Sequence, residues 1–262
     1  MTRLIRAELL KLRTARVNYG LFLTSAVLTA LFATLEAARA GNRTSAVAPL
    51  STASGLTTVT TVTGFSMLLS AVLGVIVASG EFRHNTATLT YLGAPDRARV
   101  LAAKAVASAA GGAIFGLVSA IIATGVGLAF VAGGGDQVAL GVGTLVGHAA
   151  GATLAAALLA TVGVGLGSLV RSQLAGVIGI FVWGVLVESV IGGLFTSVRP
   201  YLPYTAATTM AGAQLGGAAF GPAHDLSGGG PLPFAAAAVL VAGIAAAISL
   251  VAARTTVLDD VT

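Results

Sequence analysis

The sequence predicts an all-α membrane protein, a bundle of six transmembrane helices. Hydrophobic residues make up 56% of the chain and charged residues only 9%, whereas soluble domains typically carry about 25% charged residues. About 20 apolar residues in a helix span the hydrocarbon core of a bilayer. Six segments reach or approach that length with almost no charge: 17–35, 62–79, 101–132, 142–170, 174–195 and 234–253. Because the connections are too short for a second core, we expect a single membrane domain over residues 1–262.

Residues 2–16 are expected to form a short interfacial helix ahead of the first span. Ile5, Leu9 and Leu12 recur on one side at helical spacing, which suits burial at the headgroup boundary while cations meet anionic lipid. The alternative interpretation is a basic flank that only sets the orientation of the chain. The cations expected at the membrane interface are Arg3, Arg6, Lys11, Arg13 and Arg16.

Basic residues concentrate on alternate connections. They precede the first span, surround the connection between spans two and three, and follow spans four and six, whereas the other connections hold only Arg39, Arg43 and Arg199. This bias predicts that both termini are cytoplasmic and that the number of spans is even. The arginines flank spans rather than forming a patch with aromatic residues, so nucleic acid is not an expected partner. The excess of Arg over Lys suits a GC-rich bacterial genome and hence the bacterial plasma membrane.

Three connections carry local signals. A helix is expected from about Glu81 to Leu92, because Gly93 and Pro95 end it, and Asp96 suits the N-cap of the next helix. Tight turns are expected at 133–136 and 171–173. Residues 205–220, bracketed by prolines, are expected to form a short interfacial or re-entrant helix.

Glycines recur at helix-contact spacing. Small residues four apart let helix backbones approach closely in lipid. Packing within this chain is the preferred interpretation, and a dimer interface is the alternative. The main series is Gly143, Gly147 and Gly151, with shorter ones at Gly112 and Gly116 and at Gly163 and Gly167.

Glu188 and His148 are ionisable residues that lie inside predicted spans. A charge at bilayer depth is costly, so such residues usually face a cavity or a partner. The functional interpretation of Glu188 places it on a translocation path or in a proton-coupling site. The structural interpretation, which is preferred, pairs it with another group near the outer surface. His148 lies near the outer boundary, where it can reach water.

Enzyme signatures are missing from the sequence. There is no Gly-x-x-x-x-Gly-Lys-Ser/Thr phosphate loop and no His-Glu-x-x-His motif. The chain has no cysteine and only three histidines, which argues against thiolate or His-rich metal sites. We therefore expect no catalytic residue, metal site or cofactor-binding residue on this chain.

Three stretches resemble the permease subunit of type-two ATP-binding-cassette (ABC) exporters, as found in actinobacteria. The first is the opening RAELLKLR at 6–13. The second is GEFRHNT at 80–86, followed by LGAP at 92–95, the arginines of 97–99, and Ala103-Lys104. The third runs from Trp183 to Glu188 and is followed by Leu202-Pro203. With the order of the spans, the likeness covers nearly the whole chain.

The resemblance implies a permease that exports a drug, lipid or peptide. Two permeases, either two copies or this chain with a paralogue, would pair with two copies of a separate ATPase subunit that binds ATP and Mg²⁺. In that family the N-terminal helix and the connection between spans two and three contact the ATPase. The segment 205–220 would act as an external gate, and Glu188 would be structural or line the external vestibule. The residues implied in coupling are Glu81, Phe82, Arg83, His84, Thr86, Leu92 and Arg97.

Two other functions are considered. One is a membrane scaffold or immunity component that binds a partner without transporting. The other is an ion-coupled secondary transporter that uses Glu188. That mechanism predicts repeated halves with broken helices at matching positions, which the sequence does not show.

Overall fold

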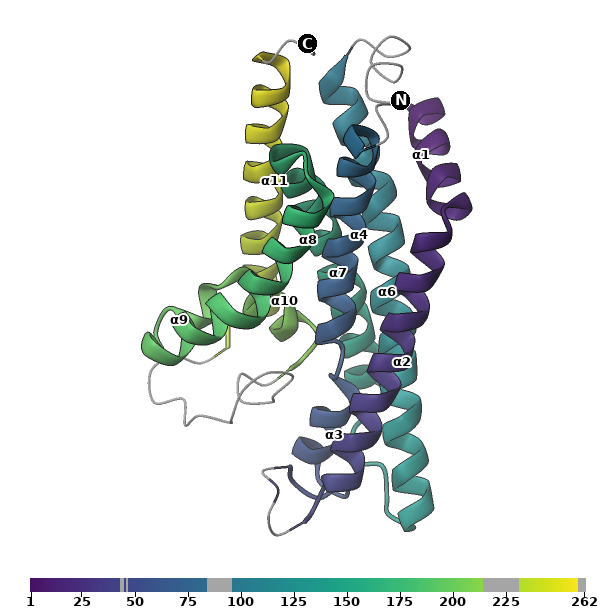
Figure 1. Cartoon of the computed structure of the whole chain (residues 1–262). Coiled ribbons are helices and arrows are strands. Elements are labelled where there is room, and N and C mark those ends of the chain that lie inside the picture. The colour runs from purple at the N-terminus through teal and green to yellow at the C-terminus, as the bar shows by residue number, and fades with distance from the viewer. Residues whose placement is uncertain (43–44, 46, 84–95, 214–230, 259–262) are drawn as a thin grey trace.

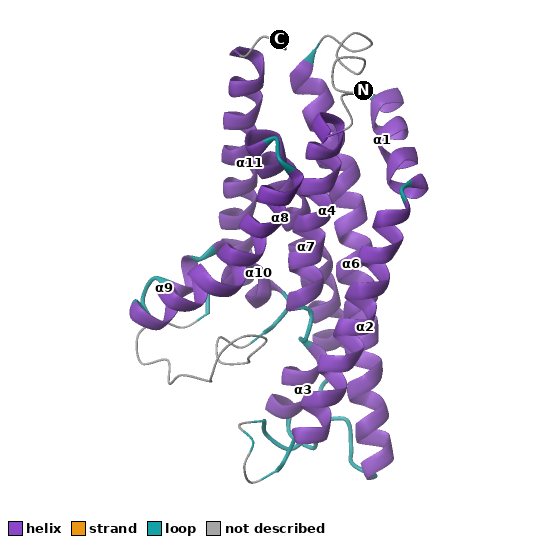
Figure 2. Cartoon of the chain, viewed as in Figure 1, coloured by secondary structure: helices purple, strands orange, loops and turns teal. Residues whose placement is uncertain are grey.

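The computed structural model of this chain is a bundle of helices. It describes residues 1–42, 45, 47–83, 96–213 and 231–258, with the backbone alone described at 81–83, 97 and 256–258. Among these residues there is no strand (Figure 2), and six helices are long and apolar enough to cross a membrane. The predicted all-α, multi-pass architecture is confirmed.

The fifth membrane-crossing helix consists of α8, a π-helical segment η1 and α9, which together we call span five. The remaining spans are α2, α4, α6, α7 and α11. The elements in chain order are α1 (Thr2–Thr14), α2 (Arg16–Arg39), α3 (Ala53–Thr60), α4 (Gly64–Arg83), α6 (Arg97–Gly134), α7 (Val142–Val170), α8 (Gln173–Phe181), η1 (Val182–Val187), α9 (Glu188–Leu194), the 3₁₀ turn η2 (Arg199–Tyr201), α10 (Pro203–Met210) and α11 (Phe234–Leu258).

The observed spans agree with the predicted ones to within a few residues, and the predicted fourth span coincides with α7.

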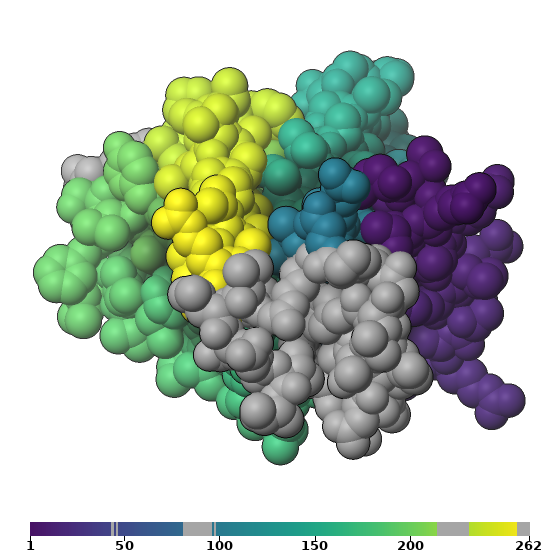
Figure 3. Space-filling view, turned by 90° about the horizontal axis from the view of Figure 1, so that it is seen from above, coloured from purple at the N-terminus to yellow at the C-terminus, as the bar shows by residue number. Residues whose placement is uncertain are grey.

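One end of the bundle, which we call the terminal end, holds the start of α1, the end of α4, the start of α6 and the end of α11 (Figure 1). Seen from that end, α1 and α2 (purple) and span five (green) lie on opposite sides of the molecule, with α4 (blue) and α11 (yellow) between them (Figure 3).

The centre of the bundle is formed by α4 and α7. Both pack extensively on α6, and α11 packs mainly on α7. The contacts between these helices are made largely by small residues: a Cβ on Gly74 of α4 or on Gly163 of α7 would overlap a backbone carbonyl of the facing helix. Close backbone approach of this kind gives helices in lipid the packing contacts that hold them together, since lipid supplies no hydrophobic drive between them.

The glycine prediction is right in part. Gly112 and Gly116 of α6 lie against the backbone of α7, and Gly167 of α7 lies against Val75 of α4. In the principal series Gly151 packs on Met210, but Gly143 and Gly147 are exposed, and a Cβ at either position would have no atom within 4 Å. For Gly143 and Gly147 the prediction of packing within this chain is wrong, and the alternative interpretation, a dimer interface, stays a prediction.

Local capping confirms the expected N-cap at Asp96 and the ends of the helices at the two expected turns. Of the expected segment 205–220, residues 214–220 lie outside the described residues. The Asp96 side chain accepts a hydrogen bond from the Arg99 amide at 3.1 Å and so caps α6. Gly135, with a φ of 73°, ends α6 in the left-handed region that glycine favours. Arg171 has a φ of 52°, and the Ser172 hydroxyl caps α8, which makes the expected tight turn between α7 and α8.

Candidate functional site

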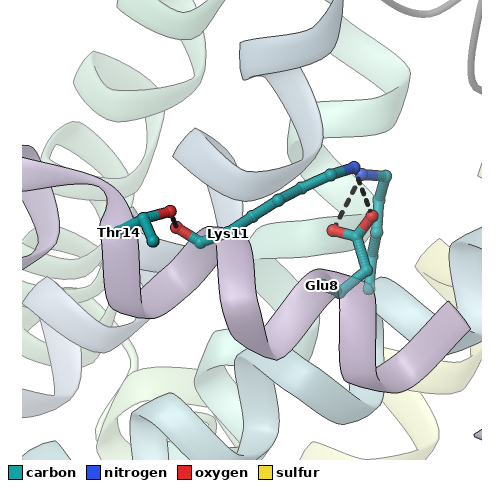
Figure 4. A network of polar contacts seen from close by, with 4 residues as sticks. Glu8, Lys11 and Thr14 are labelled. Atoms are coloured by element: carbon teal, nitrogen blue, oxygen red, sulfur yellow. Dashed lines mark hydrogen bonds and ion pairs between the residues drawn. The ribbon is translucent and has the colours of Figure 1, made fainter. Parts of the chain in front are cut away.

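In the described part of the chain, the buried charged residues lie at two places, and the first is the junction between α1 and α6. Glu8 of α1 and Lys104 of α6 are both buried, with exposed fractions of 5% and 4%. The Lys104 Nζ lies 3.1 Å from Glu8 Oε2, and the Lys11 Nζ lies 2.7 Å from Glu8 Oε1 (Figure 4). One carboxylate therefore lies between two ammonium groups.

This ion pair fixes how α1 faces the bundle. A buried charge is costly unless it is paired, so Glu8 and Lys104 hold the two helices in one relative orientation. The Leu12 side chain adds an apolar contact near Gly111 of α6 and belongs to a cluster with Leu73 and Phe115. A specific contact thus joins two residues that are 96 positions apart in the sequence.

The expected apolar face of α1 is partly wrong. Ile5 and Leu12 are half-buried as expected, but Leu9 is exposed and the residue buried between them is Glu8. The helical period accounts for this, because the buried side of α1 is centred on Glu8 and Leu12, which are four residues apart, and Leu9 lies about 100° around the helix from Glu8. The position of α1 at a membrane interface stays a prediction.

The five predicted interface cations differ in their surroundings. Lys11 contacts Glu8. The other four have exposed side chains on α1 or at the start of α2: Arg3, Arg6, Arg13 and Arg16.

The predicted coupling residues lie only partly within the described chain. Glu81, Phe82 and Arg83 form the last turn of α4, and Arg97 begins α6, so their backbones lie at the terminal end near α1. Their side chains are not described. His84, Thr86 and Leu92, and with them the helix expected to reach Leu92, lie outside the described residues.

The second polar site is centred on Glu188 of span five, whose exposed fraction is 3%. Its Oε1 accepts hydrogen bonds from Trp183 Nε1 at 2.9 Å and from the Tyr204 amide at 2.8 Å. Its Oε2 accepts from the Thr205 amide at 2.9 Å and from the Thr205 hydroxyl at 3.0 Å. Four donors from two elements therefore converge on one carboxylate.

Glu188 caps α10 from a different part of the chain. The first amides of a helix lack intrahelical acceptors, and the N-cap residue Leu202 has no side-chain oxygen to supply one. Tyr204 and Thr205 occupy this first turn, so the Glu188 carboxylate replaces the usual N-cap side chain. The N-terminal end of a helix also favours a negative charge, which offsets part of the cost of burying the carboxylate.

The π-helix contributes the fourth donor. Val182–Val187 forms i→i+5 hydrogen bonds, and Trp183 lies five residues before Glu188 within this wider turn. Glu188 is therefore paired, as the structural interpretation expected, but its partners are amides, a hydroxyl and an indole rather than a cation.

His148 lies at the edge of the α10 region. It is half-buried, its Nδ1 lies 3.4 Å from Thr60 Oγ1, and its ring borders Gly212 just after α10. In the described part of the chain, no three His, Asp or Glu residues come close enough together to hold a metal ion.

Sequence reasoning missed the ion pair at the α1–α6 junction and the π-helix. A lysine at position 104, inside the apolar stretch that begins the third span, is a signal that could have revealed the pair, since an ionisable residue in a span needs a partner. The π-helix has no comparable signal, because nothing in the residue types of Val182–Val187 distinguishes i→i+5 from i→i+4 hydrogen bonding.

Comparison with protein families and with curated proteins finds no match. The function is therefore argued from the residues and their geometry.

Proposed function

We propose that this chain is the transmembrane subunit of an ABC exporter. It forms the path for a drug, lipid or peptide, and a separate ATPase subunit binds ATP and Mg²⁺ and supplies the energy. The observation that carries the proposal is the α1–α6 junction, where two of the stretches that resemble the exporter family meet through the ion pair of Glu8 and Lys104.

The geometry of the terminal end supports this function. The helix α1, the last turn of α4 and the first turns of α6 lie together there, and the buried ion pair makes α1 and α6 a single unit. A partner that moves the connection between α4 and α6 would move this unit as a rigid body, which is a common way to transmit a switching event. The two ends of that connection are also where the proposed coupling residues Glu81, Phe82, Arg83 and Arg97 lie.

Charge placement supports the proposed orientation of the chain. Eleven of the 14 basic residues of the chain belong to the two terminal segments and to the connections after spans two and four, and only Arg39, Arg43 and Arg199 belong to the alternate connections. This bias favours the cytoplasm for the terminal end. The bacterial plasma membrane is supported by the excess of Arg over Lys in the composition. A second permease, either another copy or a paralogue, completes the proposed assembly.

The test is purification of the tagged chain from native membranes, followed by identification of any nucleotide-hydrolysing protein that accompanies it. We expect an ATPase with a phosphate loop. Absence of such a partner under conditions that preserve the membrane complex would refute the exporter.

A second step tests the coupling residues in the purified complex. Glu81→Ala and Arg83→Ala should insert normally and lower the ATPase rate that the permease stimulates, whereas Arg39→Ala on an alternate connection should not. If the ATPase is present and both variants behave as wild type, the assignment of the coupling residues is wrong, while the proposal that the chain belongs to an exporter is retained.

A further inference from the structure

The contacts of α2 fix its level along the central helices. The hydroxyl oxygens of Ser25 on α2 and Ser119 on α6 lie 3.5 Å apart. In turn, Gly116 of α6 lies against the backbone of Ala152 of α7. The helices α6 and α7 run in opposite directions, so Ser119 is level with about Ala149 of α7. Because Ser25 is close to the middle of the first span, the middle of α2 is level with Ala149.

The helix α11 lies at a different level. Gly165 of α7 lies against Ile248 of α11, and both helices run toward the terminal end. The uncharged part of α11 covers residues 234–253, and Gly243 is at its middle. Since Gly243 precedes Ile248 by five residues, it is level with Ala160 of α7.

Span five lies at the same level as α11. Its middle residue, Gly184, lies against the Leu68 side chain of α4. Gly163 of α7 lies against Ala71 of α4. Because α4 and α7 both run toward the terminal end, Leu68 is level with Ala160. The middles of α11 and of span five therefore coincide at one turn of α7.

The membrane-crossing parts of the two sides of the bundle are thus displaced along its length. Ala149 and Ala160 are eleven positions apart in α7, which corresponds to about 16 Å at a rise of 1.5 Å per residue. The hydrocarbon core of a bilayer is about 30 Å thick, so the displacement is half of that thickness. The same arrangement is visible in the fold, where α3 and the end of α2 lie farther from the terminal end than α9 and α10 do (Figure 1).

An upright bundle cannot place α2, α11 and span five correctly in one bilayer. If the bilayer is centred on α11 and span five, exposed Arg16 lies near the middle of the hydrocarbon core, because it is nine positions nearer the terminal end than Ser25. A charge at that depth is costly. If the bilayer is centred on α2, Leu250 of α11 is in water with 54% of its side chain exposed. Arg199, which packs against Gly192 of span five, then lies inside the core.

We infer that the bundle lies obliquely in the bilayer, tilted so that α2, α11 and span five cross at the same depth. The two sides are about 25 Å apart, which is two to three helix contacts of 8–10 Å each. A displacement of about 16 Å across this distance requires a tilt of about 30°, and transmembrane helices tilt by up to about 40°. The inference rests on the membrane spans and not on the exporter proposal.

The oblique placement also assigns lipid as the cover of the exposed start of α7. Val142 and Val146 are 77% and 61% exposed, and a Cβ on Gly143 or Gly147 would have no atom within 4 Å. This surface extends past the start of α11, but it is level with the second half of the uncharged part of α2. It is therefore continuous with the lipid-facing side of α2, and acyl chains cover both.

Single cysteines report the depth of each span, because the chain contains no cysteine of its own. Val27→Cys and Gly243→Cys mark the middles of α2 and α11, and Val17→Cys and Phe234→Cys mark their ends. The two valines and the phenylalanine are at least 50% exposed, and a Cβ on Gly243 would have no atom within 4 Å. Each site can therefore carry a label that faces lipid.

Each variant is labelled with bimane and reconstituted in phosphatidylcholine vesicles that contain lipids brominated at different depths of the acyl chain. In the oblique bundle, both middle labels should be quenched best by bromines near the chain end, and both end labels by bromines near the headgroup. In an upright bundle the two middle labels are about 20 Å apart along the bilayer normal. At least one end label is then deeper than the middle label on its own helix.

The inference is overturned if Val17→Cys is quenched at a deeper position than Val27→Cys, or Phe234→Cys at a deeper position than Gly243→Cys. Oriented circular dichroism of the wild-type protein distinguishes a tilted bundle from an upright one around which the bilayer bends. Helices inclined by about 30° to the bilayer normal support the tilt, and helices parallel to the normal overturn it.

Val146→Cys tests the cover of the start of α7 in the same vesicles. Quenching of its label by the brominated chains is expected, because the oblique placement puts this residue in the hydrocarbon core. A label that brominated lipid does not quench, and that a water-soluble quencher reaches instead, would overturn the assignment of lipid to this surface.

Discussion

Replacement of Gly112 by alanine tests whether close backbone approach holds this bundle together. Gly112 lies where α6 contacts α7. A Cβ at this position would stand 2.5 Å from the Ala156 carbonyl oxygen and 2.8 Å from the Ala160 Cβ. The first distance is 0.9 Å short of the 3.4 Å at which ordinary contacts begin. The near atom is backbone, so the two helices must separate or tilt.

Two opposing effects set the size of the change. Alanine in place of glycine stabilises a helix interior by about 1 kcal/mol, whereas overpacking a close contact costs about 1–3 kcal/mol. A Cβ at Gly125 on the same helix or at Gly147 on α7 would have no atom within 4 Å. The alanine variants at these two positions should therefore gain the helix stabilisation without any cost of overpacking. Gly112→Ala should therefore be less stable than Gly125→Ala by about 1–3 kcal/mol. The stabilisation of the helix by alanine is the same in both variants and drops out of this difference.

Reversible unfolding in mixed micelles, followed by circular dichroism, measures this difference. Gly147→Ala serves as a second control on the other helix. The reasoning is refuted if Gly112→Ala is as stable as Gly125→Ala, because the α6–α7 contact would then tolerate a methyl group that the structure has no room for.

Two further predictions concern buried polar groups. The first is a double-mutant cycle of Glu8→Gln and Lys104→Met. Because both groups are buried and their charged atoms lie 3.1 Å apart, the double variant should lose less stability than the sum of the two single losses, with a coupling energy of about 0.5–3 kcal/mol. Additive losses in the same unfolding assay would contradict the pairing. For Tyr204, burial and the nearby negative charge of Glu188 raise the pKa of the phenol well above its ordinary value. The unfolded chain therefore releases this proton near pH ~10 while the folded chain retains it, so the free energy of unfolding should fall as pH rises past that point. Tyr204→Phe should reduce the fall, and an identical alkaline decline in both proteins would exclude the assignment.

Much of the fold was predictable because the lipid environment constrains it. A spanning segment must be apolar and helical, so the positions of α2, α4, α6, α7 and α11 follow from hydropathy alone. Asp96 and Gly135 were predictable for a similar reason, since caps and left-handed turns depend on single residue types.

The candidate sites were less predictable because they depend on which helices meet. The spacing of Gly143 and Gly147 is the same as that of Gly112 and Gly116, yet only the second pair faces another backbone. The role of Glu188 required knowledge that α10 folds back onto span five, which no local pattern in the sequence encodes. Lys104 required the position of α1, which lies almost a hundred residues earlier in the chain.

The indole that donates to Glu188 belongs to Trp183, the sole tryptophan of the protein. Intrinsic fluorescence excited at the red edge of the aromatic band therefore arises from this one spot. Its emission wavelength and quenching report whether the indole N–H keeps its carboxylate partner, without any added dye. The molecule thus carries its own optical probe of how span five meets the helix it caps.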